Sequence, residues 1–155
     1  MLFNLSLIAL ITPLFTGVLA GFFGKNIGKA FTNGVTILGV LISLIISIYI
    51  LILILGNPEL VFNKNVYTWL SIGSYKLSIG LLIDNLTVSM MIVVNFVSLM
   101  VHIYTIGYMH KDPGYHRFFC YISLFTFAML SLVMSNNFLQ LFFGWEAVGV
   151  MLSLI

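Results

Sequence analysis

Five long apolar segments, separated by short polar connections, dominate the pattern of the chain. A helix needs about 20 predominantly apolar residues to cross a hydrocarbon core of about 30 Å. The segments that reach or approach this length are 3–23, 31–55, 84–108, 118–135 and 138–155. We predict a membrane-spanning helix for each. The fifth segment reaches Ile155 without a polar anchor or a helix-ending glycine, so we expect it to be cut short; alternatively, it ends in the membrane or at its far face.

The longest polar stretch has an alternating pattern instead of a helical one. Side chains alternate between two faces over 66–72 and again over 75–79, and the intervening Gly73-Ser74 pair is typical of a tight hairpin turn. We predict a short external β-hairpin that packs against the bundle or another chain, since an isolated hairpin is only marginally stable. The alternative is an unstructured external loop at the membrane surface. The predicted parts are helices one and two (1–55), the external loop with its hairpin (56–83) and helices three to five (84–155).

The composition excludes an ordinary soluble domain. Of the 155 residues, 61% are apolar and 6% are charged, compared with about 45–50% and about 25% in soluble proteins. With so few charges the surface must face the lipid bilayer, and both disorder and nucleic-acid binding are excluded. The single cysteine, Cys120, excludes a disulfide framework and a thiolate metal site. The predicted fold class is all-α, a polytopic transmembrane helix bundle of about five spans.

Basic residues in the short loops predict the orientation of the chain in the membrane. Four lie in the first and third loops and two in the second, and none precedes the first span. In chain order they are Lys25, Lys29, Lys64, Lys76, Lys111 and Arg117. The positive-inside rule therefore places the first and third loops in the cytoplasm or matrix and the N-terminus outside. The lack of a basic residue before the first span also argues against a cleaved signal peptide.

Glu146 is the acidic residue that falls deep inside a predicted span. It lies nine residues after Asn137, which is about 14 Å into the fifth helix at 1.5 Å per residue and close to the midplane. Charge there costs roughly 2.5–3.5 kcal/mol, so an intramembrane carboxylate suggests a function such as proton or cation transfer. Gly149, one turn later, lets another helix or water approach. No lysine or arginine lies in any span, so a basic partner must come from elsewhere; alternatively, Glu146 is a neutral interhelical hydrogen-bonding acid.

Three further residues are candidates for roles within or at the ends of the spans. His102 lies in the inner half of the third span, and imidazole, which titrates near neutral pH, suits a proton relay; hydrogen-bonded packing is the alternative. Asp84 opens the third span, where the helix macrodipole favours a carboxylate, so we expect it to cap the helix. Arg117 is expected to anchor a helix end or to pair with an acid of a neighbouring helix. The histidines lack the spacing of a metal site, and we predict none.

Several local strings resemble one family of membrane proteins. They are 101–109 (VHIYTIGYM), 112–113 (DP), 117–119 (RFF), 125–130 (FTFAML), 135–138 (SNNF) and 144–149 (GWEAVG). In this order they resemble the N-terminal region of the antiporter-like membrane subunit of respiratory complex I. That family is called NADH-quinone oxidoreductase subunit L in bacteria and NADH dehydrogenase subunit 5 in mitochondria. The resemblance is strong from about Tyr67 to Gly149.

The resemblance implies a proton-translocating membrane module of NADH:quinone oxidoreductase. Glu146 matches the family's glutamate of the fifth helix, which pairs with a lysine on a later helix, and His102 and Arg117 also match family positions. The family's subunit has well over a dozen helices, so this chain is expected to be a fragment, a split-gene product or a truncated copy. Its expected partners are the missing C-terminal helices and the other membrane subunits of complex I.

The sequence leaves two alternatives to this function, and it predicts that the redox chemistry takes place on other subunits. The alternatives are a subunit of a multi-component cation/proton antiporter or membrane-bound hydrogenase, and a fragment that transports nothing. Because the sequence has no cysteine cluster and no Gly-x-Gly-x-x-Gly motif, NADH, flavin, iron-sulfur clusters and quinone are expected on other subunits. We expect an energy-transducing membrane, the bacterial inner membrane in preference to the mitochondrial one, and little activity from this chain alone.

Overall fold

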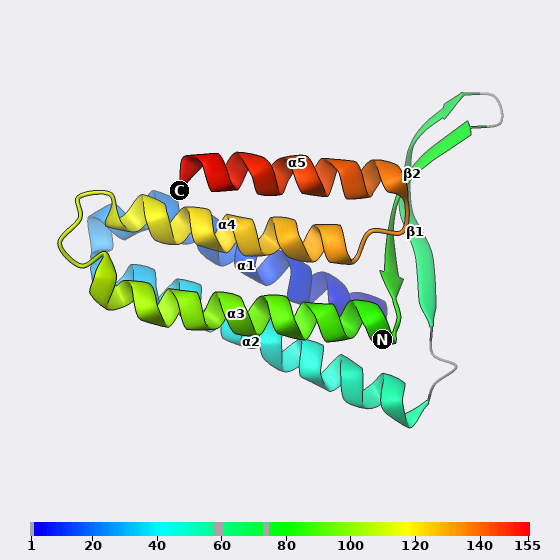
Figure 1. Ribbon diagram of the computed structural model, residues 1–155, viewed down its shortest axis with the longest axis horizontal. Coiled ribbons are helices and arrows are strands. Elements are labelled where there is room, and N and C mark those ends of the chain that lie inside the picture. Colours follow the sequence, from blue (N-terminus) through cyan, green and yellow to red (C-terminus); the bar gives the residue numbers. More distant parts are fainter. Residues whose placement is uncertain (1, 58–60, 73–74) are drawn as a thin grey trace.

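The computed structural model describes residues 2–57, 61–72 and 75–155 and consists there of five helices and one β-hairpin (Figure 1). In chain order the elements are α1 (Leu2–Ile27), α2 (Lys29–Gly56), β1 (Phe62–Ile72), β2 (Tyr75–Ile83), α3 (Asn85–Tyr108), α4 (Tyr115–Val133) and α5 (Phe138–Leu154). All five predicted helices and the hairpin are confirmed, and the helix bounds differ from the predicted ones by up to four residues.

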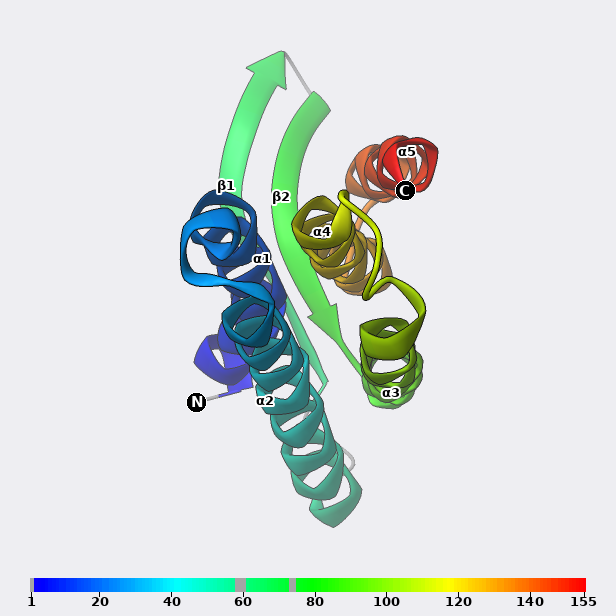
Figure 2. The same ribbon diagram turned by 90° about the vertical axis from the view of Figure 1, so that its left-hand side faces the viewer.

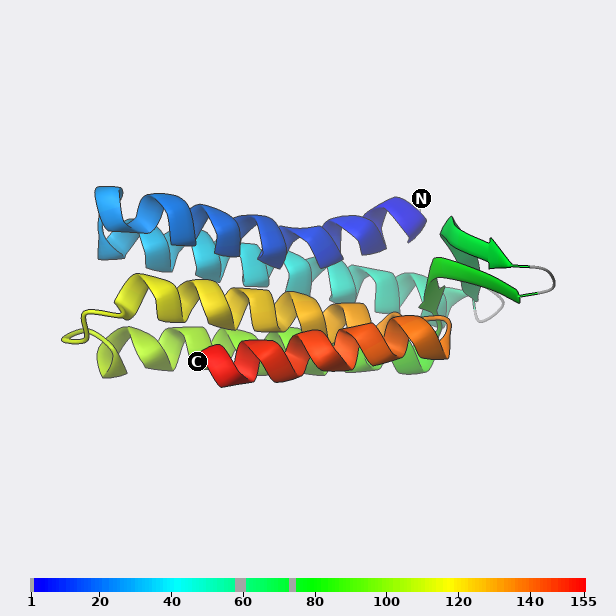
Figure 3. The same ribbon diagram turned by 90° about the horizontal axis from the view of Figure 1, so that it is seen from above.

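Four of the helices, α1 to α4, are long and apolar enough to cross a membrane. The helix α5 is also apolar but has 17 residues, about the lower limit for a span. All five run roughly along one axis (Figures 1 and 3). The α1–α2 and α3–α4 connections lie at one end of the bundle, called here the loop end. The hairpin and the α4–α5 connection lie at the other, the hairpin end (Figure 1).

Viewed along the helices, α1 and α2 form one side of the bundle and α3, α4 and α5 the other (Figure 2). The helix α4 lies between α3 and α5 and also packs against α1. The helix α5 packs against α4 and leaves its opposite side uncovered within the described part of the chain. This arrangement gives α5 one buried face and one face that is free to meet another molecule or lipid.

An apolar core lies near the hairpin end of the bundle. It joins side chains from α1, α2, α3, α4 and β2, namely Ala9, Ile50, Ile54, Leu81, Ile83, Val88, Met91, Leu130 and Met134, and all of them are at most 3% exposed. Because Leu81 and Ile83 belong to the hairpin, the strands are anchored in the same core as the helices. The expectation that the hairpin packs against the bundle is therefore confirmed.

The hairpin is antiparallel and longer than the alternating pattern indicated. Its register pairs Phe62 with Ile83 and Ile72 with Tyr75, and it has irregularities between Asn65 and Tyr67 and between Thr68 and Leu70. The alternative of an unstructured loop is therefore wrong. The predicted Gly73-Ser74 turn lies outside the described residues. The strands extend past the alternating segments because residues at their bundle end pair through the backbone and pack on the helices, which does not require alternation.

Candidate functional site

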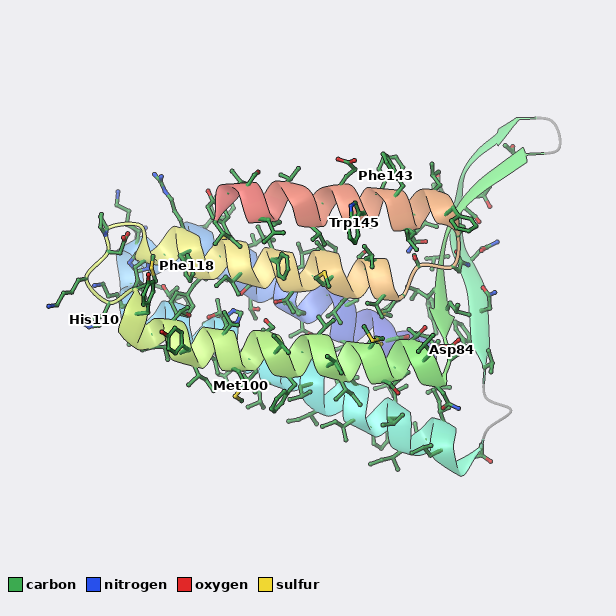
Figure 4. The ribbon with its side chains drawn as sticks, in the orientation of Figure 1. Asp84, Met100, His110, Phe118, Phe143 and Trp145 are labelled. Carbon is green, nitrogen blue, oxygen red and sulfur yellow. The ribbon has the colours of Figure 1, made fainter. Side chains whose placement is uncertain are left out.

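Glu146 lies near the middle of α5, a helix otherwise made mainly of apolar residues (Figure 4 labels its neighbour Trp145). Asn137 starts this helix, because its side-chain oxygen accepts a hydrogen bond from the backbone N–H of Gln140 at 2.9 Å. From Phe138, eight residues at 1.5 Å each place Glu146 about 12 Å along the axis. The carboxyl is therefore held at a fixed distance from the hairpin end by a helix that begins at a defined residue.

The side chain of Glu146 is on the face of α5 that points away from the bundle. Gly144 and Val148 are the buried residues of α5, and they share one face because they are four residues apart. A Cβ added to Gly144 would come within 3.0 Å of the Leu132 backbone, so this face is in close contact with α4. Glu146 lies about 200° around the helix from both Gly144 and Val148, and it is exposed.

Glu146 lines a shallow hollow of about 280 Å³, and the other lining residues are Trp145, Gly149, Val150 and Ser153. None of these four residues carries a charge. A Cβ added to Gly149 would meet no atom of another described element within 4 Å, so the space at Gly149 is open. The site thus has an acid, a small residue that permits close approach, and one hydroxyl.

His102 has the opposite surroundings, because it is fully buried between α3 and α4. Its Nε2 lies 3.1 Å from the Ser123 hydroxyl, and its Nδ1 lies 2.8 Å from the Ser98 carbonyl oxygen and 3.3 Å from the Ser98 hydroxyl. The Ser98 hydroxyl in turn lies 2.5 Å from that of Thr126. The hydrogen-bonding partners of both ring nitrogens are therefore neutral. Through them His102 contacts Ser98 on its own helix, α3, and Ser123 on α4.

This polar interior continues towards α2. The Asn95 side-chain amide donates to the Ser47 hydroxyl at 3.2 Å, and the Ser43 hydroxyl donates to the Ala9 carbonyl of α1 at 2.7 Å. The Asn95 side-chain oxygen is buried and has no hydrogen-bond partner. Asn95 and Ser98 share a face of α3 with His102 by their helical spacing. The α4 partners Ser123 and Thr126 were not predicted, because nothing in the sequence shows that their hydroxyls face α3.

The remaining candidates lie at the two ends of the bundle. Asp84 is the N-cap of α3, and its carboxylate accepts a hydrogen bond from the Thr87 N–H at 2.7 Å (Figure 4). Arg117 is exposed in the first turn of α4, near the loop end. His116, beside it, is 2.8 Å from the Thr32 hydroxyl through its Nδ1. In the described ranges, no three His, Cys, Asp or Glu side chains come close enough together to hold a metal ion.

The structure does not bring the candidates together into one site. His102 is inside the bundle between α3 and α4, and Glu146 is on the outer face of α5, beyond α4 (Figure 2). Asp84 lies at the hairpin end, and Arg117 lies towards the loop end. Of these four, Glu146 is the exposed ionisable group in the middle of an apolar helix.

Comparison with known proteins identifies related chains over nearly the full length. The family described as NADH-Ubiquinone oxidoreductase (complex I), chain 5 N-terminus, matches residues 69–119. NADH-quinone oxidoreductase subunit L of Neisseria meningitidis serogroup A is 57% identical over 148 residues, which cover 95% of this chain and 22% of the relative. NADH-ubiquinone oxidoreductase chain 5 of Dictyostelium discoideum is 42% identical over 149 residues, which cover 94% and 22%.

A solved structure has the same fold. It is that of the membrane-bound sulfane sulfur reductase, an archaeal respiratory membrane complex, in which one chain matches with a TM-score of 0.71 at 17% identity, over 93% of this chain and 21% of that one. The chain thus spans about a fifth of the length of the proteins that it matches. Over nearly its whole length, the chain is similar to part of subunit L, or chain 5, of NADH-quinone oxidoreductase, and the family model that matches residues 69–119 is that of the chain 5 N-terminus.

Proposed function

We propose that the chain forms the N-terminal membrane portion of a proton-translocating, antiporter-like subunit of NADH:quinone oxidoreductase, and that Glu146 carries protons there. The observation that carries this proposal is the exposed position of Glu146 in the middle of an apolar helix, beside the open space at Gly149. The names of the curated relatives, which are subunits of this oxidoreductase, support the choice of complex.

The physical argument starts from the cost of an acid in hydrocarbon. A carboxylate that faces acyl chains costs several kcal/mol, so intramembrane acids normally face protein or a hydrated cavity. The residues lining the hollow around Glu146 include no basic group. We therefore infer that a helix outside this chain covers the hollow and brings a basic side chain to Glu146. The resemblance implies that this side chain is a lysine, whose approach and departure would release and recover a proton.

The two ends of the bundle support an orientation in the membrane. The loop end holds Lys25, Lys29, Lys111 and Arg117, and the hairpin end holds Lys64 in β1. By the positive-inside rule, the loop end faces the cytoplasm or matrix, whereas the N-terminus and the hairpin lie outside. We propose an energy-transducing membrane, and the bacterial inner membrane in preference to the mitochondrial one, because the subunit L relative of Neisseria is the more similar of the two described above.

The redox chemistry belongs, in this proposal, to other subunits. NADH, flavin, iron-sulfur clusters and quinone bind there, and this chain contributes to the proton path. Its partners are the other membrane subunits, helices equivalent to the remaining part of its relatives, and the lipid bilayer. Because the proton path requires those helices, we expect the isolated chain to translocate no protons.

Exchange of Glu146 for glutamine tests the function. In membranes that contain the assembled complex, the number of protons translocated per NADH oxidised should fall roughly tenfold or more. Ser153→Ala is the matched control, because Ser153 lines the same hollow without an ionisable group, and it should retain the parent ratio. A Glu146→Gln complex that assembles normally and translocates protons at the parent ratio would overturn the proposal.

A further inference from the structure

The β-hairpin is joined to the start of α5 by side-chain hydrogen bonds. The backbone N–H of Gly80 in β2 donates to the Gln140 side-chain oxygen at 3.0 Å, and the Asn137 side-chain amide donates to the Ser78 carbonyl at 2.6 Å. Gln140 lies in the first turn of α5, and Asn137 is its N-cap. We call the four residues Gly80, Asn136, Asn137 and Gln140 the hairpin clamp.

Asn136 fills the space that a side chain at position 80 would need. A Cβ added to Gly80 would lie 2.0 Å from the Asn136 amide nitrogen and 2.5 Å from its Cγ. The same amide nitrogen donates to the side-chain oxygens of Asn63 and Asn65 in β1, at 3.1 and 2.9 Å. Both strands therefore hold the α4–α5 connection, and a side chain at position 80 would displace the Asn136 side chain from its bonds to β1.

Further bonds fix the turn that leads into α5. The Leu82 N–H donates to the Met134 carbonyl at 3.0 Å, and Leu81 forms a β-bridge with Ser135. The Asn137 amide also donates to the Asn136 side-chain oxygen at 2.9 Å. Asn137, which begins α5, is thus bonded both to the hairpin, through the Ser78 carbonyl, and to the first turn of α5, through the Gln140 N–H.

The clamp is important for Glu146 because α5 has little else to fix its position. Within the described part of the chain α5 packs mainly on α4, through a face that includes Gly144 and Val148. If α5 shifted along this single interface, each residue of slip would move a side chain by about 1.5 Å along the axis and 100° around it. Gln140 precedes Glu146 by six residues, or about 9 Å along the axis, so the clamp sets the depth and direction of the carboxyl.

We propose that the hairpin clamp is a positioning device that holds α5 in the register at which Glu146 meets its proton-transfer partner. This inference rests on the proposed function of Glu146 for its effect on proton translocation. The positions of the clamp residues and of α5 can be measured independently of that function. The clamp residues are positioning residues, since none of them lines the hollow at Glu146.

Two changes loosen the clamp in different ways, and each has a matched control. Gly80→Ala forces a Cβ into Asn136, whereas Gly56→Ala adds the same methyl group near the same end of the bundle, where no atom lies within 4 Å. Gln140→Leu removes the acceptor of the Gly80 N–H, whereas Gln140→Glu keeps an oxygen acceptor.

The experiment compares proton translocation per NADH oxidised with the position of α5 in the assembled complex. We expect Gly80→Ala and Gln140→Leu to lower the ratio severalfold at normal assembly, while both controls keep the parent ratio. Cryo-electron microscopy of the Gln140→Leu complex should show α5 rotated or displaced against α4. A merely structural role would instead lower the amount of complex and leave the ratio of the assembled fraction unchanged.

A parallel Glu146→Gln complex separates the two proposals. If Glu146→Gln lowers the ratio but the assembled clamp variants keep both the parent ratio and the parent position of α5, the clamp proposal is overturned and the proposed function stands. If Glu146→Gln leaves the ratio unchanged, the proposed function fails. A displaced α5 in the Gln140→Leu complex would then still show that the clamp sets the register of α5, and an undisplaced α5 would overturn this as well.

Discussion

His102 and Glu146 are both ionisable residues in apolar helices, but their surroundings differ in every respect. His102 is fully buried, and both of its ring nitrogens have hydrogen-bonding partners on α3 and α4. Glu146 is exposed on α5, and its hollow is lined by uncharged residues. A polar group whose partners are all inside the chain stabilises the chain, whereas one that faces outwards requires a partner from outside. From this comparison we expect His102 mainly to stabilise the bundle and Glu146 to take part in the proposed proton transfer.

The largest effect is expected from removing the acid entirely. Glu146→Leu should lower proton translocation by about tenfold or more. Any loss of thermal stability in the assembled complex should be limited to the contact with the proposed basic partner, because the other described residues that line the hollow carry no charge. Proton translocation is measured in membrane vesicles with NADH, and stability by the midpoint of thermal unfolding. A large loss of stability with retained proton translocation would show that Glu146 stabilises the bundle and does not carry protons.

His102→Ala should have the opposite profile. It leaves a cavity in the α3–α4 interface and removes the partner of Ser123, so we expect a loss of about 2–4 kcal/mol in stability. The midpoint of thermal unfolding should fall, and the ratio of protons to NADH in the complex that still assembles should stay at the parent value. His102→Gln, which keeps a hydrogen-bonding side chain, should recover part of the stability. A fall in the ratio for both variants would assign His102 a proton-relay role instead.

Asp84 provides a second carboxyl for comparison with Glu146, because its partner lies in the chain. Asp84→Ala removes the acceptor of the Thr87 N–H, which should cost about 1 kcal/mol of stability, as for other helix N-caps. Asp84→Asn keeps a capping oxygen and should lose less. Unfolding midpoints of the two variants measure the difference, and a changed proton ratio in either would show that Asp84 acts in proton transfer.

The smallest effect is expected at the far edge of the polar interior. Ser47→Ala removes the acceptor of the Asn95 amide, and interhelical hydrogen bonds of this kind contribute about 0.6 kcal/mol on average in membranes. A double-mutant cycle with Asn95→Ala measures this coupling directly. A coupling near zero would show that Asn95 and Ser47 only touch, and would limit the stabilising network to the residues around His102.

The sequence predicted the elements better than it predicted their contacts. Apolar length identified all five helices, because crossing a membrane requires it, and alternation identified the hairpin. Asn63 and Lys64 were not predicted as strand residues, because two consecutive polar residues break the alternation of polar and apolar positions. In the structure they pair with β2 through the backbone.

Contacts between elements depend on which helices become neighbours, and this is absent from a single sequence. Ser123 and Thr126 read as ordinary small residues of an apolar helix, but packing of α4 on α3 makes them partners of the His102 network. In the same way, the sequence indicates only that Asn136 and Asn137 connect two helices. The folded hairpin shows that their side-chain amides donate hydrogen bonds to β1 and β2. The position of Glu146 along α5, in contrast, followed directly from residue counting along one helix.

A structure of the chain within its assembled complex, at a resolution that shows side chains, tests the central claim most directly. We predict that a basic side chain from outside this chain, or an ordered water that leads to one, lies within about 4 Å of the Glu146 carboxyl. A Glu146 carboxyl that faces only acyl chains, with no basic group or water beside it, would contradict the account.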